Sequence, residues 1–121
     1  MNKEILHNEF IASVENANMV LDGLIKRAIT EAVGVDSGRL RDTSFAFIEL
    51  ENGTQKPIGV DIKTTDYYKF LDKGTRHIDA KNITERFKSY DEFKVQMRTV
   101  VTKWVKWQTA IEINTILKED N

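Results

Sequence analysis

Apolar residues recur at steps of three and four along residues 1–33, a spacing that lines one face of an α-helix. The stripe consists of Ile5, Leu6, Phe10, Val14, Ala17, Leu21, Leu24, Ile25, Ala28, Ile29 and Ala32. The glutamates of the segment fall off this stripe, so we expect them to face solvent. Gly34 stands where a left-handed residue would end the helix. The pattern therefore predicts a helix over residues 1–33, about 45 Å long.

The hydrophobic period changes from helical to alternating at Phe45, after the turn residues Asp36-Ser37-Gly38. Apolar residues occupy both alternating faces up to Leu50, as in a strand covered on both sides. Asn52-Gly53 is a strong hairpin signal. A half-buried return strand follows, with apolar positions Ile58, Val60 and Ile62. We predict an antiparallel hairpin over residues 44–63.

Two more helical regions follow the hairpin. Asp66 is placed to cap a short helix over residues 66–73, which Gly74 would end. Its apolar residues are Tyr67, Tyr68, Phe70 and Leu71. Residues 75–83 show no period and predict a loop. The last helical region covers residues 84–118, with a break expected near Tyr90.

The apolar stripe of the last region comprises Phe93, Met97, Val100, Val101, Trp104, Val105, Ile111 and Ile116 or Leu117. Trp107 and Ile113 lie away from its centre, which indicates a second contact surface. The whole pattern predicts one α+β domain over residues 1–121. It has a long N-terminal helix, a small sheet based on an antiparallel β-hairpin, a short helix and a long C-terminal helix.

Composition narrows the class of protein. The length of 121 residues suits one domain. Without cysteine the chain can form neither disulfides nor thiolate zinc sites. Eighteen Lys and Arg against nineteen Asp and Glu give a net charge of −1, which disfavours a general nucleic-acid binder. No apolar run is long enough to span a membrane, and the N-terminus lacks the apolar stretch of a signal peptide. We therefore expect a small soluble intracellular protein.

Candidate catalytic groups are few. His77 and Asp79 in the predicted loop could pair as base and orienting carboxylate, with Asp66 nearby in sequence. Two residues are too few for a closed metal site, and an ordinary hydrogen bond from a loop histidine explains them more simply. The glycines form no phosphate-binding loop, and the carboxylates form no close pair. We expect no catalytic, cofactor or metal site, and hence no enzyme.

Basic residues are concentrated near the C-terminus. Between Glu85 and Gln108, six basic residues stand against three acidic ones, a local charge of +3. Four of the six lie close to Trp104 and Trp107: Lys94, Arg98, Lys103 and Lys106. Such a face can contact a DNA backbone. A solvated helix face opposite the core is the simpler explanation.

Three segments, in this order on this pattern of elements, resemble a known family: two short motifs and, between them, the strand pair that ends in Val60-Asp61-Ile62. The first motif is Ser37-Gly38-Arg39-Leu40-Arg41 followed by Ser44. The second motif runs from Tyr67 to Thr75 and matches at Tyr67, Tyr68, Phe70, Leu71, Asp72, Gly74 and Thr75. Together they resemble the small neck proteins of tailed bacteriophages, the head–tail joining or tail-completion family. That family's "A-R-P-F" stretch is not preserved here beyond Ala80.

The resemblance implies a structural virion protein of the neck or tail, assembled in the host cytoplasm. It implies a ring of about six or twelve copies that joins the portal or adaptor to tail proteins. No cofactor and no membrane would be involved, and nucleic acid would be an incidental partner. The alternative function is a small DNA-binding or regulatory module that uses the basic C-terminal helix.

We expect structural roles for several residues of the two motifs. Gly38 would let the chain turn sharply toward the sheet, and Leu40 would enter the core. Tyr68, Phe70 and Leu71 would pack the short helix on the hairpin. Gly74 would end that helix, and Thr75 would lead into an exposed loop. The candidate contacts with other proteins are Arg39, Arg41, Arg76, His77 and Trp107.

Overall fold

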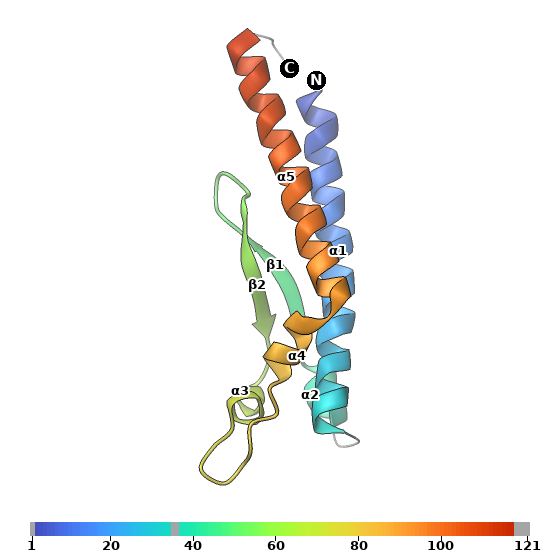
Figure 1. Ribbon diagram of the computed structural model, residues 1–121, viewed down its shortest axis with the longest axis vertical. Helices are drawn as coiled ribbons and strands as arrows, with labels where there is room; N and C mark the ends of the chain where they lie inside the picture. Colours follow the sequence, from blue (N-terminus) through green and yellow to red (C-terminus); the bar gives the residue numbers. More distant parts are fainter. Residues whose placement is uncertain (1, 35–36, 118–121) are drawn as a thin grey trace.

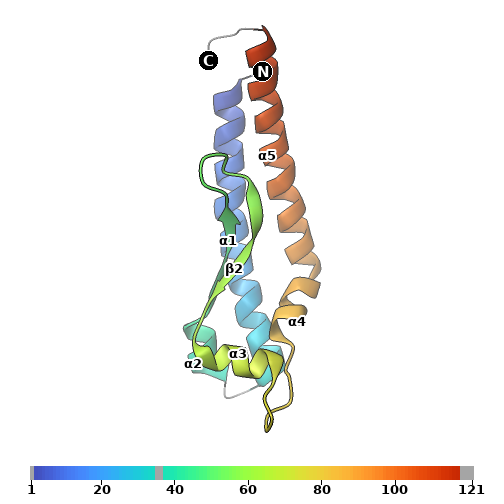
Figure 2. The same ribbon diagram turned by 90° about the vertical axis from the view of Figure 1, so that its left-hand side faces the viewer.

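The protein is described by a computed structural model that covers residues 2–34 and 37–117. The elements are α1 (Lys3–Val33), α2 (Gly38–Asp42), β1 (Phe45–Leu50), β2 (Pro57–Lys63), α3 (Asp66–Lys73), α4 (Ile83–Ser89) and α5 (Asp91–Leu117). The two long helices run antiparallel, side by side, and the hairpin packs beside the middle part of α1 (Figures 1 and 2). This architecture confirms the predicted α+β fold class.

The first helix begins and ends as its sequence predicts. Asn2 caps it, since its side-chain oxygen accepts from the backbone N–H groups of Glu4 (3.0 Å) and Ile5 (3.2 Å). Gly34 follows the last helical residue with a positive φ of 89° and donates its N–H to the Thr30 carbonyl. The fully covered stripe of α1 is Phe10, Val14, Ala17, Leu21, Leu24, Ile25, Ala28 and Ile29. Met1 and Lys118, the ends of the predicted helical regions, lie outside the described residues.

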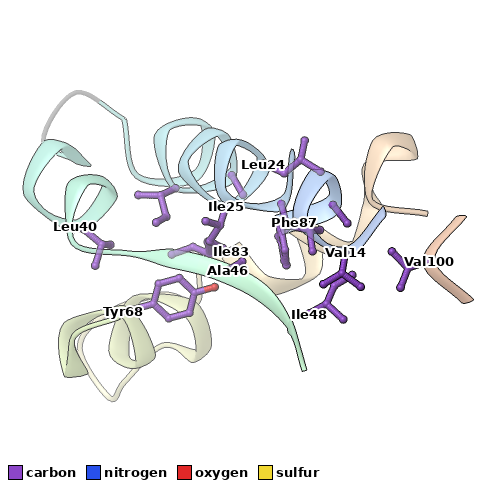
Figure 3. Packing of buried hydrophobic residues seen from close by; sticks show 14 of the residues in the cluster. Val14, Leu24, Ile25, Leu40, Ala46, Ile48, Tyr68, Ile83, Phe87 and Val100 are labelled. Carbon is purple, nitrogen blue, oxygen red and sulfur yellow. The ribbon is translucent and has the colours of Figure 1, made fainter. Parts of the chain in front are cut away.

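The hairpin lies with one face on α1. Ala46 and Ile48 of β1 are buried in the core (Figure 3), and their partners Ile62 and Val60 on β2 pack against it. The free edge of β1 is covered by polar side chains of α1. Asn18 accepts from the Ile48 N–H at 2.7 Å, and further along α1 a lysine ammonium donates to the carbonyl of Ser44, just before the strand. Bonds of this kind satisfy an edge that would otherwise expose unpaired backbone groups.

The predicted helix break falls at Tyr90, between α4 and α5, where the backbone becomes extended. Its ring lies under the guanidinium of Arg27, 4.3 Å from the ring centre, and its hydroxyl donates to Glu31 at 2.6 Å. Burial, and then the bond to Glu31, raise the pKa of Tyr90 to about 12. The same bond holds the pKa of Glu31 below its usual value. Tyr90 thus holds the junction of α4 and α5 against the C-terminal end of α1.

The apolar stripe predicted for α5 is partly wrong. Val100 is buried as predicted, and the predicted Phe93, Met97 and Trp104 are partly buried against the core. Ala110 and Asn114, which the pattern did not include, are also buried. Val101, Val105, Ile116 and Leu117 are instead exposed by between 45% and 77%. The periodicity misled because α5 carries apolar residues on two faces, and only one of them meets α1.

Trp107 also differs from its prediction as a second contact surface. Its ring stacks on Phe10 at 5.7 Å between centroids and lies 4.2 Å from the ring of His7. Both partners belong to α1, so Trp107 is part of the contact between the two long helices. His7 is half-buried in the same contact, and its Nε2 lies 3.1 Å from Oε1 of Gln55 in the hairpin loop.

Candidate functional site

The second motif forms a connected unit at the lower end of the molecule. The Thr84 hydroxyl donates to one oxygen of Asp72 at 2.7 Å, and the Thr84 N–H donates to the other at 2.8 Å. Asp72 of α3 therefore satisfies an otherwise unpaired N–H in the first turn of α4. The Tyr68 hydroxyl lies 2.8 Å from the Thr84 hydroxyl, which joins the buried Tyr68 ring to the same pair. Burial raises the pKa of Tyr68 to about 12, against a weaker opposing effect of Thr84.

Gly74 ends α3, as predicted, in a conformation that favours glycine. Its φ is 79° and its N–H donates to the Phe70 carbonyl. A Cβ atom here would lie 2.8 Å from the Ala80 nitrogen and 2.9 Å from the Ile78 carbonyl oxygen. The glycine thus lets the chain fold back on itself over residues 75–82.

Thr75 closes that loop. Its N–H donates to the Ile78 carbonyl at 2.8 Å, and its hydroxyl accepts from the N–H groups of His77 and Ile78. Lys81 then donates its N–H to the carbonyl of Leu71 in α3. The predicted loop is accordingly a compact projection fastened to α3 at its base.

The loop presents Arg76, His77 and Asp79 to solvent, at the end of the molecule opposite the first turn of α1 and the last turn of α5 (Figure 1). None of these three belongs to an ion pair among the described residues. Asp66 lines an open groove of about 590 Å³ between β2, α3 and α4, but His77 does not line it. Asp66 therefore does not share this groove with His77 and Asp79, the candidate base and orienting carboxylate.

Other positions around α3 need correction. Asp66 is the first helical residue and not the cap; Thr65 holds the cap position, without a side-chain hydrogen bond. Tyr68 and Leu71 are buried as predicted, but Phe70 is 49% exposed and does not pack on the hairpin. Phe70 points away because successive residues of a single helical turn cannot all face one neighbour.

The first motif is built around two buried serines. Ser37 and Ser44 are 2% and 0% exposed, and the Ser44 hydroxyl lies 2.6 Å from that of Thr64. Leu40 is buried, as predicted. Gly38 is not the turn residue that the sequence indicated: it starts α2 without a positive φ, and an added Cβ would meet only the Arg41 side chain at 3.8 Å. Asp36 of the predicted turn lies outside the described residues.

The arginines of the first motif differ in their surroundings. Arg39 is exposed, and its side chain helps to line a surface pocket of about 430 Å³ with Tyr67. Arg41 is partly covered and lies 3.4 Å from the carboxylate of the adjacent Asp42. Arg39 is therefore the more accessible of these two candidate contact residues.

The basic residues of α5 do not form a single continuous face. Lys94, Arg98 and Lys106 are exposed, whereas Lys103 is partly covered and pairs with Glu9 of α1 at 3.6 Å. Neither tryptophan is presented for stacking on bases. Trp107 packs on α1, and the Trp104 indole donates to the Thr54 carbonyl of the hairpin loop at 3.1 Å.

Large apolar side chains remain uncovered on most elements. They are Ile5, Met19, Phe45, Ile58, Tyr67, Phe70, Val95, Val101, Val105, Ile116 and Leu117. Several of these, Ile5 among them, lie on the apolar stripes predicted to face the core. The exposed Ile5 and Met19 lie opposite the buried stripe of α1, which its pattern did not indicate. A helical projection centred on the charged face would have shown them.

The described residues offer little material for metal chemistry or membrane insertion. They contain no cluster of three or more His, Asp or Glu side chains able to hold a metal ion. Within the same ranges, no helix combines the length and the apolar character needed to cross a bilayer. Comparison of the chain with protein-family models, curated proteins and solved structures finds no match.

Proposed function

We propose that the chain is a structural protein of a tailed-phage virion, a head–tail connector or tail-completion protein that assembles as a ring in the neck. The observation that carries the proposal is the order of the two motifs on this pattern of elements. The second motif supports it further, since Tyr68, Asp72 and Gly74 serve to fasten a projecting loop and do not converge on a reaction centre. In such a protein, a fixed projection is suited to contact a neighbouring virion protein.

The exposed apolar residues also support an assembly role. Side chains as large as Met19 and Ile116, each 77% exposed, contribute to association when a partner covers them. The elongated shape adds to this, because the upper parts of α1 and α5 extend beyond the hairpin (Figures 1 and 2). Arg39, Arg76 and His77 are the proposed contacts with portal, adaptor or tail proteins.

The test is the oligomeric state and the binding partners. We expect mass photometry of the purified protein, alone or mixed with the portal and tail proteins encoded beside it, to show rings of about six or twelve copies. Virions would then contain the chain at the neck. A protein that stays monomeric at high concentration and in the presence of those partners would overturn the proposal.

A DNA-binding function is the second candidate, favoured by one observation. Residues 93–111 contain four basic side chains and no acidic one. A gel-shift assay at low salt tests it: backbone binding would retard DNA and weaken steeply as salt is added. The absence of retardation at low salt would eliminate this function.

A further inference from the structure

The exposed face of α5 carries a second repeat of mixed apolar and polar residues, which we call the outer α5 seam. It consists of Val95, Arg98, Thr102, Val105, Thr109, Glu112 and Ile116, all of them exposed. Their alternating steps of three and four are the spacing of a coiled-coil contact. Every seventh residue, from Val95 to Ile116, is β-branched. The repeat is separate from the face that α5 packs on α1.

The exposed face of α1 carries a corresponding repeat, the outer α1 seam. It consists of Ile5, Asn8, Ala12, Glu15 and Met19, again at alternating steps of three and four and all exposed. The side chains of Asn8 and Ala12 are short and protrude little from α1, so another helix can approach closely. Neither seam is covered within the described parts of the chain.

The two seams match in height along the molecule. Within the chain, Asn16 lies beside Gln96 (3.4 Å) and Glu9 beside Lys103 (3.6 Å). Because the helices are antiparallel, each step back along α1 is one step forward along α5 (Figure 1). Ala12 is therefore within about two residues, roughly 3 Å, of the level of Thr102.

A second copy placed beside the first at the same height would bring the seams together in register. The resulting levels, within about two residues, are Met19 with Val95, Glu15 with Arg98, Ala12 with Thr102, Asn8 with Val105 and Ile5 with Thr109. Apolar or small side chains thus meet β-branched ones, and a carboxylate meets a guanidinium. A rotation axis parallel to the long helices preserves these heights.

Charge decides which helix of the second copy lies on the outer α5 seam. Glu9 and Lys103 already pair with each other within the chain. The charges that remain are acidic on α1 between Glu4 and Ile25 and basic on α5 over residues 93–111: Glu4, Glu15 and Asp22 against Lys94, Arg98 and Lys106. An α5 helix on another α5 helix would bring like charges together, and an α1 helix would bring opposite charges. Neither Glu15 nor Arg98 has an ion-pair partner among the described residues.

We propose that the outer α1 seam of one copy packs on the outer α5 seam of the next copy. The two surfaces are different, so each copy uses both of them, and the contact is heterologous. Repeated about an axis parallel to the helices, such contacts close into a ring. This interface rests on the proposed function, for which it supplies the contact between copies.

Charge reversal across the seam tests this interface. We expect Glu15→Arg and Arg98→Glu, each alone, to weaken self-association about fivefold per contact, because each replaces an attraction by a repulsion. Mixing the two variants should restore association, since every contact in a ring of alternating copies then pairs a carboxylate with a guanidinium. The double variant should also recover. Lys88→Glu, an equal charge reversal at an exposed position of α4, is the matched control and should leave self-association unchanged.

A bulky substitution tests the apolar part of the contact. Ala12→Arg should prevent ring formation, while its far-UV circular dichroism and thermal midpoint stay those of the parent, because Ala12 is exposed. Rings that persist unchanged in all these variants would overturn the seam and leave the proposed function standing. A parent protein that never associates, even with portal and tail proteins, would overturn both. DNA retardation lost in Arg98→Glu, with association unchanged in Glu15→Arg, would assign the basic face to nucleic acid and overturn the seam.

Discussion

Gly74→Ala tests whether backbone packing fixes the loop that follows α3. Alanine at this position must adopt a φ of 79°, a region that L-residues rarely occupy at a cost of about 1–3 kcal/mol. Its Cβ must also fit 2.8 Å from the Ala80 nitrogen and 2.9 Å from the Ile78 oxygen. Both neighbours are backbone atoms, which cannot move aside as a flexible side chain can. We expect a total loss of about 3 kcal/mol in the free energy of unfolding.

Two other glycines separate the conformational cost from the overlap. Gly34 and Gly53 have φ values of 89° and 86°, and no atom of the described residues lies within 4 Å of a Cβ added to either. Alanine there should cost only about 1–2 kcal/mol. Gly59, with neither a positive φ nor a near neighbour, should tolerate alanine with almost no change.

Urea unfolding followed by far-UV circular dichroism measures all four variants. Hydrogen exchange adds a local measurement, since the Thr75 and Lys81 amides should lose protection in Gly74→Ala as their bonds to Ile78 and Leu71 lengthen. A loss no greater in Gly74→Ala than in Gly34→Ala, with both amides still protected, would refute the reasoning. The loop would then be free to move away from the added methyl group.

Three further predictions concern buried polar groups. Asn114 is 1% exposed, and neither polar atom of its side chain has a hydrogen-bond partner among the described residues, so Asn114→Leu should raise the free energy of unfolding by about 1–3 kcal/mol. The same substitution at the exposed Asn16, Asn16→Leu, should leave the thermal midpoint nearly unchanged. A lower thermal midpoint for Asn114→Leu would contradict this prediction. Thr84→Val removes the hydroxyl between Tyr68 and Asp72 and should lower the free energy of unfolding in urea by about 1–2 kcal/mol. In the double variant Tyr68→Phe/Thr84→Val, the total loss should be smaller than the sum of the two single losses. Full additivity would argue against a connected network. Burial raises the pKa of Tyr68 from 10.0 to about 12, so between these pH values the folded protein keeps a proton that the unfolded chain releases. The free energy of unfolding should therefore fall as the pH rises from about 10 toward 12. A Tyr68→Phe variant with the same decline over that range would show that other groups cause it.

The sequence predicted best where apolar residues line the core-facing side of a helix at almost every turn. The predicted stripe of α1 contains all eight of the helix's buried residues, although Ile5, which the pattern also placed on it, is 55% exposed. Local backbone chemistry was equally informative. Gly34 and Gly74 end helices as expected, and Tyr90 marks the break between α4 and α5, because helix ends depend on the conformational preferences of a few neighbouring residues.

Prediction was weaker for α5, whose apolar residues lie on two faces. Periodicity alone gives no reason to prefer Val100 over Val101, and composition gives none to bury Asn114. Only the position of α1 decides which face is covered. Trp107 looked like a surface for partners for the same reason, until the stacking on Phe10 placed it between the long helices.

The sequence by itself determined the order and type of the elements, the buried face of α1 and the residues that end its helices, since these follow from periodicity and from local backbone preferences. Tertiary structure alone decided the features that depend on contacts between residues far apart in the sequence. It linked Asp72 to Thr84 and gave Gly74 its tight neighbours. It also left the outer seams of α1 and α5 uncovered, since a helix with two apolar faces can turn only one of them to its own core.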